Sequence, residues 1–379
     1  MHLDAASHPL RPDPAARGGW TVASGDGSES LDSWLAARGA GPMAARVPVL
    51  TFGSNRCPSK ITWLRENLGL TGPVVVLRAR VRGVAAVWAA GLRARDGARP
   101  ATLAVDDGGR PETHAVWMAT PAQVAVLDVC EGRGERYDLA RLHAASVRTE
   151  DGASLDDPWT YWPVDGLRAP LLVDGVPVRC ADVAQDAARD LVGTPAPLAP
   201  GAATSVVGAP DPDTWPDRVF VYGTLQPGRS AWWRLAPHAL ATAPARAAGR
   251  VHDTGRGYPA LALGPGDAVG TVVTLADPAA ALPLLDAYEG PEYRRARGVA
   301  YLDSDSQSHS DSGTHSDSGT HSGSAASSQS IHSTQSDRSD RSSQSDRSSA
   351  GAEGRGTPCW MWVWDSPLGN WPMVEGAWS

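Results

Sequence analysis

Residues 285–290 read LDAYEG and residues 127–132 read LDVCEG, so one Leu-Asp-x-x-Glu-Gly string occurs in each half of the chain. Each copy ends an apolar run that begins near a proline, and each is followed shortly by a tyrosine with arginines. A chain of 379 residues is long enough for about two domains. The repeated string therefore indicates a duplicated domain.

Hydrophobic patterning around the two strings predicts a similar order of strands and helices. In the first half we expect strands at 47–52, 74–82, 101–105, 114–119 and 137–147, and helices at 61–68 and from 121 to the first string. In the second half we expect extended segments at 218–222, 245–251, 258–263, 268–275 and 359–365, and helices at 232–240 and 278–290. Pro283 is expected to break or kink the last helix. Strands that do not strictly alternate with helices favour the α+β class.

Composition marks the boundaries of the domains. Residues 1–45 carry Pro, Gly, Asp and Ser and predict a flexible segment, with a short helix near 31–37 started by Ser30. Residues 193–217 are dense in Pro, Ala and Gly, which is typical of a linker. We therefore expect a leader at 1–45, a first domain at 46–192, a linker at 193–217, and a second domain at 218–379 that contains a disordered Ser-rich insertion at 303–357.

Charge and cysteine content restrict the partners. A net charge of −8 and a pI near 5.7 lack the basic footprint that nucleic acid or anionic membrane binding requires. The four cysteines, Cys57, Cys130, Cys180 and Cys359, form no pair or cluster with metal-ligand spacing, so neither a structural zinc nor a disulfide framework is expected. No apolar run approaches a membrane span, and the sequence predicts a cytoplasmic protein of undetermined oligomeric state.

Both halves open with a strand that runs into a turn of small residues, LTFGSN at 50–55 and FVYGTL at 220–225. A glycine followed by Ser or Thr lets the backbone bend sharply, so that several N–H groups can converge on an anion such as a carboxylate. Taken alone, either turn is also compatible with an ordinary strand end. The two turns are therefore candidate anion sites only in combination with a second signal.

That second signal is a glutamate in each repeated string. The spacing i, i+3, i+7 joins Val124, Leu127 and Glu131 in the first half and Leu282, Leu285 and Glu289 in the second. On a helix this spacing places each carboxylate on the apolar face, where charged residues are rarely buried without a reason.

The spacing alone leaves two readings of each glutamate open. One is a buried ion pair, with Arg294 or Arg295 as the partner of Glu289. The other is a general acid/base whose pKa is moved towards neutrality by an apolar pocket. Glu292 lies beyond the Gly290-Pro291 turn and is the weaker candidate.

These motifs resemble the γ-glutamylcyclotransferase-like family, which includes γ-glutamylamine cyclotransferases and plant avirulence-induced-gene relatives. In the second half the resemblance rests on YGTL at 222–225, GYPAL at 257–261, AVGTVVTL at 268–275 and LDAYEGPEYRR at 285–295. In the first half it rests on FGSN at 52–55, RVRGV at 80–84, ARPATLAV at 98–105 and LDVCEGRGERYDLAR at 127–141. The resemblance implies two tandem copies of a small mixed α/β barrel-like domain with a pocket at its mouth.

The resemblance also implies an activity and its residues. Such enzymes cyclise a γ-glutamyl amine or peptide to 5-oxoproline and release the amine, without a cofactor or metal, and the glutamate of the repeated string serves as general acid/base. Carried to this sequence, the catalytic residues are Glu289 and Glu131. The implied substrate-binding residues are Tyr222, Gly223, Thr224 and Leu225 in the second half and Phe52, Gly53, Ser54 and Asn55 in the first.

Two departures and two alternatives accompany this interpretation. Phe52 stands where the family usually has tyrosine, which removes one polar handle, and His114 is expected to crowd the first pocket. Trp232 and Trp233 are expected either to line the second pocket or to pack in the core.

The chain could instead be a γ-glutamyl deacylase of the aminoglycoside-biosynthesis type, or a non-catalytic tandem protein that binds γ-glutamyl compounds or a protein partner.

Overall fold

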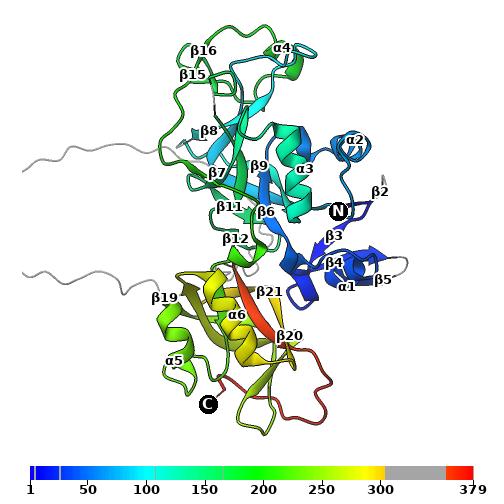
Figure 1. Cartoon of the computed structure of the whole chain (residues 1–379), viewed down its shortest axis with the longest axis vertical. Coiled ribbons are helices and arrows are strands. Elements are labelled where there is room, and N and C mark those ends of the chain that lie inside the picture. Colours follow the sequence, from blue (N-terminus) through cyan, green and yellow to red (C-terminus); the bar gives the residue numbers. More distant parts are fainter. Residues whose placement is uncertain (4–5, 25–26, 107, 165, 304–355, 379) are drawn as a thin grey trace, which may run out of the picture.

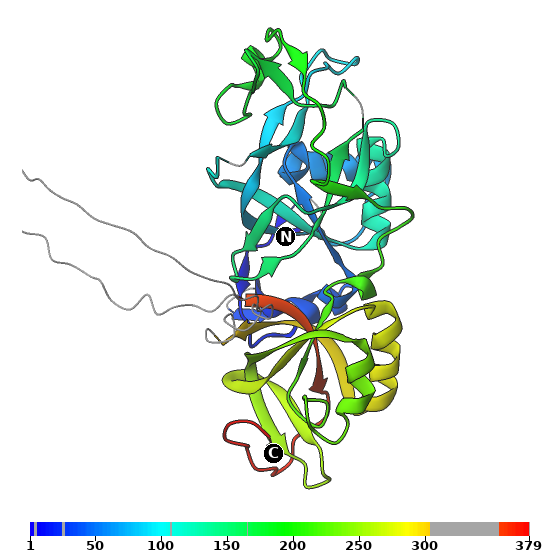
Figure 2. The same ribbon diagram turned by 90° about the vertical axis from the view of Figure 1, so that its left-hand side faces the viewer.

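The computed structural model describes residues 1–3, 6–24, 27–106, 108–164, 166–303 and 356–378. Two lobes are stacked along the long axis of the molecule, and the N-terminal residues lie beside their junction (Figures 1 and 2). We call the part built on residues 46–205 the first lobe and the part built on 218–303 and 356–378 the second lobe. None of the described helices is both long enough and apolar enough to cross a membrane.

The second lobe is a closed five-stranded barrel in the order β18-β20-β19-β21-β22. Its elements are β18 (Arg218–Val221), α5 (Trp232–Leu235), η5 (Ala236–His238), β19 (Ala239–Asp253), β20 (Pro259–Leu275), α6 (Pro278–Glu289), β21 (Tyr293–Leu302) and β22 (Gly356–Trp364). The first strand β18 pairs antiparallel with β20 and parallel with β22, which closes the barrel. Leu282 and Leu285 of α6 pack with Trp360 and Trp362 of β22 in one core cluster.

The first lobe is a mostly antiparallel nine-stranded sheet that curls without closing. Its elements are β6 (Val47–Thr51), η3 (Ser54–Arg56), α2 (Pro58–Leu68), β7 (Val75–Trp88), β8 (Ala101–Asp106), β9 (Glu112–Ala119), α3 (Pro121–Glu131), β10 (Tyr137–Leu142), β11 (Ser146–Thr149), β12 (Ser154–Leu155), β13 (Trp159–Pro163) and β17 (Ala203–Ser205). A small outer sheet, β14 (Leu171–Val173), β15 (Val176–Pro177) and β16 (Thr194–Pro195), accompanies α4 (Gln185–Ala188).

The two lobes share one order of strands. The first lobe contains the path β7-β9-β6-β13-β10, and the barrel, opened between β19 and β21, reads β19-β20-β18-β22-β21. In each path the central strand, β6 or β18, pairs parallel with one neighbour and antiparallel with the other. The paths differ at their ends, because β7 pairs with β11 and β10 pairs with β17 where the barrel pairs β19 with β21.

The expected flexible leader at 1–45 is wrong for its described residues. They form β1 (His2–Leu3), β2 (Ala6–Ser7), β3 (Leu10–Pro12), η1 (Arg17–Gly19), β4 (Trp20–Ser24), β5 (Gly27–Ser30), α1 (Leu31–Ala36) and η2 (Met43–Ala45). Trp20, Leu31 and Trp34 are buried in the core of the first lobe, and this apolar burial offsets the cost of ordering the segment. The short helix does begin at Ser30, whose side chain accepts a hydrogen bond from the Ser33 N–H.

Other local expectations also need correction. The segment 137–147 is two strands, β10 and β11, and the 193–217 stretch contributes β16 and β17 to sheets, as well as η4 (Pro212–Thr214). Helix α6 continues through Pro283, which is exposed, and the carbonyl of Ala279 that loses its donor also lies in an exposed residue, where water can bond it. Most of the insertion expected at 303–357 lies outside the described residues, but Gly356 and Thr357 already belong to β22.

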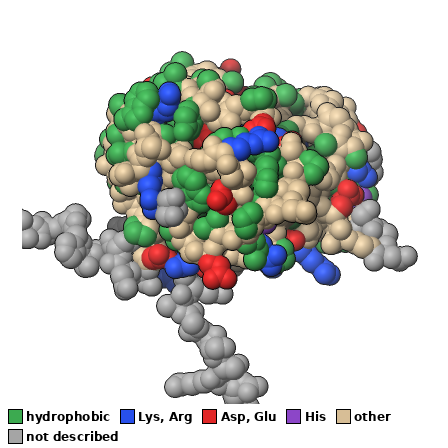
Figure 3. All heavy atoms as spheres, turned by 90° about the horizontal axis from the view of Figure 1, so that it is seen from below, with side chains coloured by type: hydrophobic (Ala, Val, Ile, Leu, Met, Phe, Trp, Pro, Cys, Tyr) green, Lys and Arg blue, Asp and Glu red, His purple; other side chains and the backbone are tan. Residues whose placement is uncertain are grey.

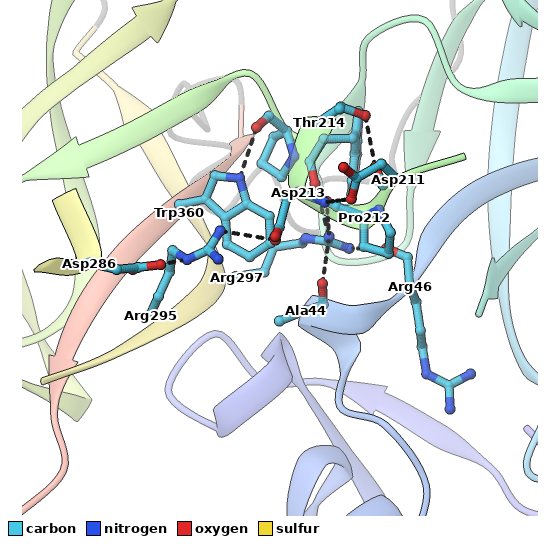
Figure 4. A network of polar contacts seen from close by, with 12 residues as sticks. Ala44, Arg46, Asp211, Pro212, Asp213, Thr214, Asp286, Arg295, Arg297 and Trp360 are labelled. Carbon is cyan, nitrogen blue, oxygen red and sulfur yellow. Dashed lines mark hydrogen bonds and ion pairs between the residues drawn. The ribbon is translucent and has the colours of Figure 1, made fainter. Parts of the chain in front are cut away.

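A buried arginine makes several of the contacts between the barrel and the segments that precede it (Figure 4). Arg297 of β21 is only 8% exposed, and its guanidinium donates to the carbonyls of Met43 (3.0 Å), Ala44 (3.1 Å), Arg46 (2.7 Å) and Trp215 (2.9 Å). Burial lowers the pKa of Arg297 to about 9, so the group is still charged at neutral pH. Backbone carbonyls from two distant segments thus take the place of water around one buried charge.

Arg295, two residues earlier on β21, continues this junction. Its guanidinium lies 3.1 Å from Asp286 of α6 and 3.1 Å from Asp213 of η4. The neighbouring Trp360 of β22 donates its indole N–H to the carbonyl of Pro216 at 2.9 Å. These contacts position α6 and β22 against the chain that enters the barrel (Figure 4).

We predict that Arg297→Met lowers the free energy of unfolding by about 3 kcal/mol, because four backbone carbonyls, three of them in buried contacts, lose a charged donor. Urea denaturation followed by tryptophan fluorescence measures this loss. Arg250→Met, on the exposed side of β19, is the matched control and should change stability by less than about 0.5 kcal/mol. Equal stabilities for the two variants would contradict the assigned role of Arg297.

Candidate functional site

The second lobe has a cavity of about 250 Å³ between the turn after β18 and the C-terminal end of α6. Tyr222, Gly223, Thr224, Leu225 and Glu289, the residues expected from the sequence, all line it. Phe220, Val221, Tyr258, Pro259, Tyr288, Glu292, Tyr293 and Trp362 complete its wall. The structure therefore brings together a turn and a carboxylate that lie more than sixty residues apart in the sequence.

The turn begins where β18 ends, because Phe220 and Val221 are buried strand residues and Gly223 follows them immediately. Among the described residues, the backbone N–H groups of Gly223, Thr224 and Leu225 have no hydrogen-bond acceptor. Free N–H groups at a cavity wall are a site for a carboxylate or a developing oxyanion.

Glu289 is the last residue of α6 and is carried on the buried face of that helix with Leu282 and Leu285. Asp277 caps the helix by accepting a hydrogen bond from the Ala280 N–H, and the helix ends at Gly290. The Glu289 carboxylate has no hydrogen-bond partner among the described residues. Burial raises its pKa to about 7, with a further contribution from the negative charge of Asp286.

Glu292 lines the same cavity but is placed differently. Its carboxylate accepts hydrogen bonds from Tyr258 Oη at 3.1 Å and from Arg256 Nη1 at 3.1 Å. Its side chain is 44% exposed. Glu292 is therefore a paired carboxylate at the rim, whereas Glu289 is an unpaired one in the interior.

Two hydroxyl groups of the turn are occupied by protein partners. Tyr222 is buried and donates to the carbonyl of Trp362 at 2.6 Å, which joins β18 to β22. Thr224 Oγ1 lies 3.0 Å from Tyr288 Oη. The hydroxyl of Tyr222 thus helps to close the barrel and does not point to a ligand. Phe52, at the corresponding position of the first lobe, therefore lacks a contact between strands and not a polar group of the cavity.

Sequence reasoning missed four aromatic residues of this wall. Tyr258, Tyr288 and Tyr293 lie inside the motifs GYPAL and LDAYEGPEYRR, so proximity to those motifs was an available signal. Trp362 lies on β22, beyond the 304–355 stretch, and only its strand pairing with Arg295 of β21 brings it to the cavity.

The first lobe has a larger cavity, of about 790 Å³, in the corresponding place. All five residues expected there, Phe52, Gly53, Ser54, Asn55 and Glu131, line it. Glu131 ends α3 as Glu289 ends α6. The turn after β6 and the end of α3 therefore meet at one pocket.

Glu131 is held by a side-chain donor that Glu289 lacks. Asn55 Nδ2 donates to Glu131 Oε1 at 2.7 Å. Burial raises the pKa of Glu131, although the Asn55 hydrogen bond and the charge of Lys60 oppose this shift. The carboxylate of the first lobe is thus engaged with Asn55, while that of the second is free to receive a ligand.

Three residues that the sequence suggested near the pockets lie elsewhere. Trp233 is 64% exposed and Trp232 packs against the core cluster of α6, so neither lines the cavity of the second lobe. His114 is buried, lies 2.8 Å from Glu112 and is not among the residues that line the first cavity. No group of three or more His, Cys, Asp or Glu residues in the described parts of the chain is arranged to hold a metal ion.

Comparison with known proteins bears on the second lobe. Residues 219–311 match the model of the family described as "Gamma-glutamyl cyclotransferase, AIG2-like". The matched residues contain the turn, α6 and β21, and they make up about a quarter of the chain. No curated protein matches the chain. The crystal structure of YkqA from Bacillus subtilis matches at 11% identity and a TM-score of 0.20, over 68% of this chain and 79% of that one, a likeness too low to support an argument.

We predict that Glu289→Gln changes the pH dependence of stability. The pKa of Glu289 is raised in the folded state, so the folded protein binds a proton more tightly than the unfolded chain, and stability falls as pH rises from about 4.5 to about 7. Relative to wild type, the glutamine variant should gain about 2 to 3 kcal/mol between pH 4.5 and pH 8. Urea denaturation across this range tests it, with Glu66→Gln on the exposed side of α2 as control. Parallel curves for wild type and Glu289→Gln would refute the raised pKa.

We predict that alanine is tolerated at Gly53 but not at Gly223. A Cβ atom at Gly223 would lie 2.6 Å from Pro259 Cγ, whereas at Gly53 the nearest atom, Ala101 Cβ, is 3.9 Å away. Gly223→Ala should therefore lower the free energy of unfolding by about 1–3 kcal/mol through overpacking, and Gly53→Ala by clearly less. Denaturation of both variants measures the difference, and equal losses would contradict the close approach at Gly223.

Proposed function

We propose that the chain is a γ-glutamylcyclotransferase-like enzyme and that the second lobe converts a γ-glutamyl amine or peptide into 5-oxoproline and a free amine. One observation carries this proposal: Glu289, with a pKa near 7 and no protein partner among the described residues, shares a small cavity with three free backbone N–H groups. A general base is most effective when its pKa lies near the working pH. The family of residues 219–311 supports the same chemistry.

The reaction needs little beyond shape and this base. The carboxylate of Glu289 takes a proton from the substrate's α-ammonium group, and the amine nitrogen then attacks the γ-carbonyl carbon of the same molecule. The new bond closes a five-membered ring, and the carbonyl oxygen becomes an oxyanion that the N–H groups of Gly223, Thr224 or Leu225 can stabilise. Because nucleophile and electrophile share one molecule, holding it folded supplies the proximity.

Collapse of the oxyanion then breaks the bond between the γ-carbon and the leaving nitrogen. Protonated Glu289 gives its proton to that nitrogen, so that the carboxylate is restored for the next cycle. The ring nitrogen still carries a second proton, which the restored carboxylate takes and passes to the same leaving group, so that the amine departs as an ammonium ion and both protons are accounted for. No oxidant, reductant or other reactant is consumed.

The exposed rim fits the leaving amine. Tyr258, Tyr288 and the paired carboxylate of Glu292 lie around the mouth, and no Lys or Arg is among the residues that line the cavity. Because Arg256 already compensates the charge of Glu292, the preference rests on the aromatic faces and on the lack of Lys or Arg in the lining, which favour neutral or cationic groups over anionic ones. We therefore propose an amine without a carboxylate as the preferred leaving group, which is also compatible with the γ-glutamyl deacylase alternative.

We propose further that the first lobe is a second copy of the domain. Its support is the shared path of five strands, with a helix that ends in a glutamate at the same place relative to the strand-end turn. The alternative for this lobe is that it binds γ-glutamyl compounds without catalysis, as in a tandem binding protein, because Asn55 already donates a hydrogen bond to one oxygen of Glu131.

We predict that Glu289→Gln lowers 5-oxoproline release from γ-glutamyl amines by about a thousandfold, since the variant lacks the base. In wild type, kcat/KM should rise with pH and level off above about 7, as the free carboxylate of Glu289 becomes populated. Chromatographic detection of 5-oxoproline measures both. Glu66→Gln is the control for the substitution itself. Full activity in Glu289→Gln, with loss in Glu131→Gln, would move the chemistry to the first lobe.

A further inference from the structure

The cavity of the first lobe is lined by seven Arg and Lys side chains and by one carboxylate, that of Glu131. This basic lining stands out in a chain whose net charge is −8. Six of the seven, Arg56, Lys60, Arg93, Arg95, Arg136 and Arg168, are at least partly exposed. The cavity of the second lobe has Glu289 and Glu292 and no basic residue in its lining, so the two cavities differ in electrostatic sign.

Not all of these cations are available to a ligand. Arg99 is buried and spends its guanidinium on four carbonyls, including Ala188 and Leu191, so its role is structural. Arg93 and Arg95 share one carboxylate, that of Asp96, which leaves an excess of positive charge on their loop. Lys60 lies over the Trp63 ring at 3.7 Å from its centroid and faces the cavity beside Glu131.

These cations come from two separate parts of the lobe, which we call the two walls of the cavity. Lys60 belongs to α2, directly after the turn, while Arg93 and Arg95 belong to the loop between β7 and β8. A cavity with low-dielectric walls and one sign of charge concentrates ions of the opposite sign. Its volume, about 790 Å³ against about 250 Å³ in the second lobe, leaves room for a ligand that reaches both walls.

We propose that the first lobe is a second ligand site, for a small molecule with two carboxylates, one held near Lys60 and the other by Arg93 and Arg95. On the end of the molecule that the second lobe presents, acidic, basic and apolar side chains are intermixed (Figure 3). The proposal concerns binding only, so it does not depend on whether Glu289 or Glu131 performs catalysis.

The chain contains its own probe of this site, because Lys60 is its only lysine. Reductive methylation with ¹³C-formaldehyde keeps the positive charge and labels Lys60 and the N-terminus, whose NMR signals are distinguished by a Lys60→Arg sample. The titrants are linear dicarboxylates from glutarate to azelate, which have no amide bond to cleave, and the monoamide of each. The expected result is a saturable shift of the Lys60 signal, with the monoamide binding about tenfold more weakly, a loss of about 1.4 kcal/mol.

Variants of the loop identify the second wall. In Arg93→Gln/Arg95→Gln the affinity for the dicarboxylate should fall to that of the monoamide. Arg110→Gln is a matched control, since Arg110 is as exposed as Arg95 (61% and 62%), is likewise paired with one aspartate, and does not line the cavity. Protection of Cys57 from iodoacetamide by the dicarboxylate provides a second measurement on unmethylated protein, because Cys57 lines the same cavity.

Three results would overturn the proposal. The first is the absence of a saturable shift with every dicarboxylate of the series. The second is equal affinity for a dicarboxylate and its monoamide, which would reduce the site to a single anion. The third is unchanged dicarboxylate affinity in Arg93→Gln/Arg95→Gln, which would remove the loop from the site.

Discussion

The burial of one guanidinium group governs how this chain is assembled. Removing the Arg297 guanidinium from water would be costly, and this cost is offset because carbonyls of residues 43–46 and of Trp215 converge on it and the rings of Trp215 and Trp360 pack against it. Those carbonyls belong to the segments that enter the first lobe and the barrel. The N-terminal residues, the connection between the lobes and strand β21 must therefore adopt their positions together, since any one of them alone would leave the charge or its acceptors unsatisfied.

This constraint reaches the cavity of the second lobe through β21. Two residues before Arg297, Arg295 lies 3.1 Å from Asp286, which is one turn of α6 before Glu289. At the start of β21, Tyr293 lines the cavity and donates to the carbonyl of Pro259 at 2.6 Å. Asp286 also adds to the raised pKa of Glu289 through its negative charge. The junction of the lobes thus fixes the helix end that carries the glutamate, and with it the electrostatics around that carboxylate.

Features that depend on neighbouring residues in the sequence could be predicted, and features that depend on contacts between distant residues could not. The turn at 222–225 and the helix that ends at Glu289 can be predicted because a strand end and a helical spacing are local patterns, and the barrel brings both to one cavity. Trp362 could not be found, because only the pairing of β21 with β22 brings it there. The folding of residues 1–45 was missed for the same reason, since Trp20 and Trp34 show no periodicity and are buried only by the core of the first lobe.

The difference between the two cavities follows from a difference in closure. In the second lobe β19 pairs with β21, the barrel closes, and the space at its mouth is small. In the first lobe the corresponding strands β7 and β10 pair instead with β11 and β17, so the same path of strands stays open. An open path leaves the loop after β7, with Arg93 and Arg95, beside the turn and α2. One arrangement of strands can therefore present a small acidic pocket and a large basic one, and the ligands they accept should differ in charge accordingly.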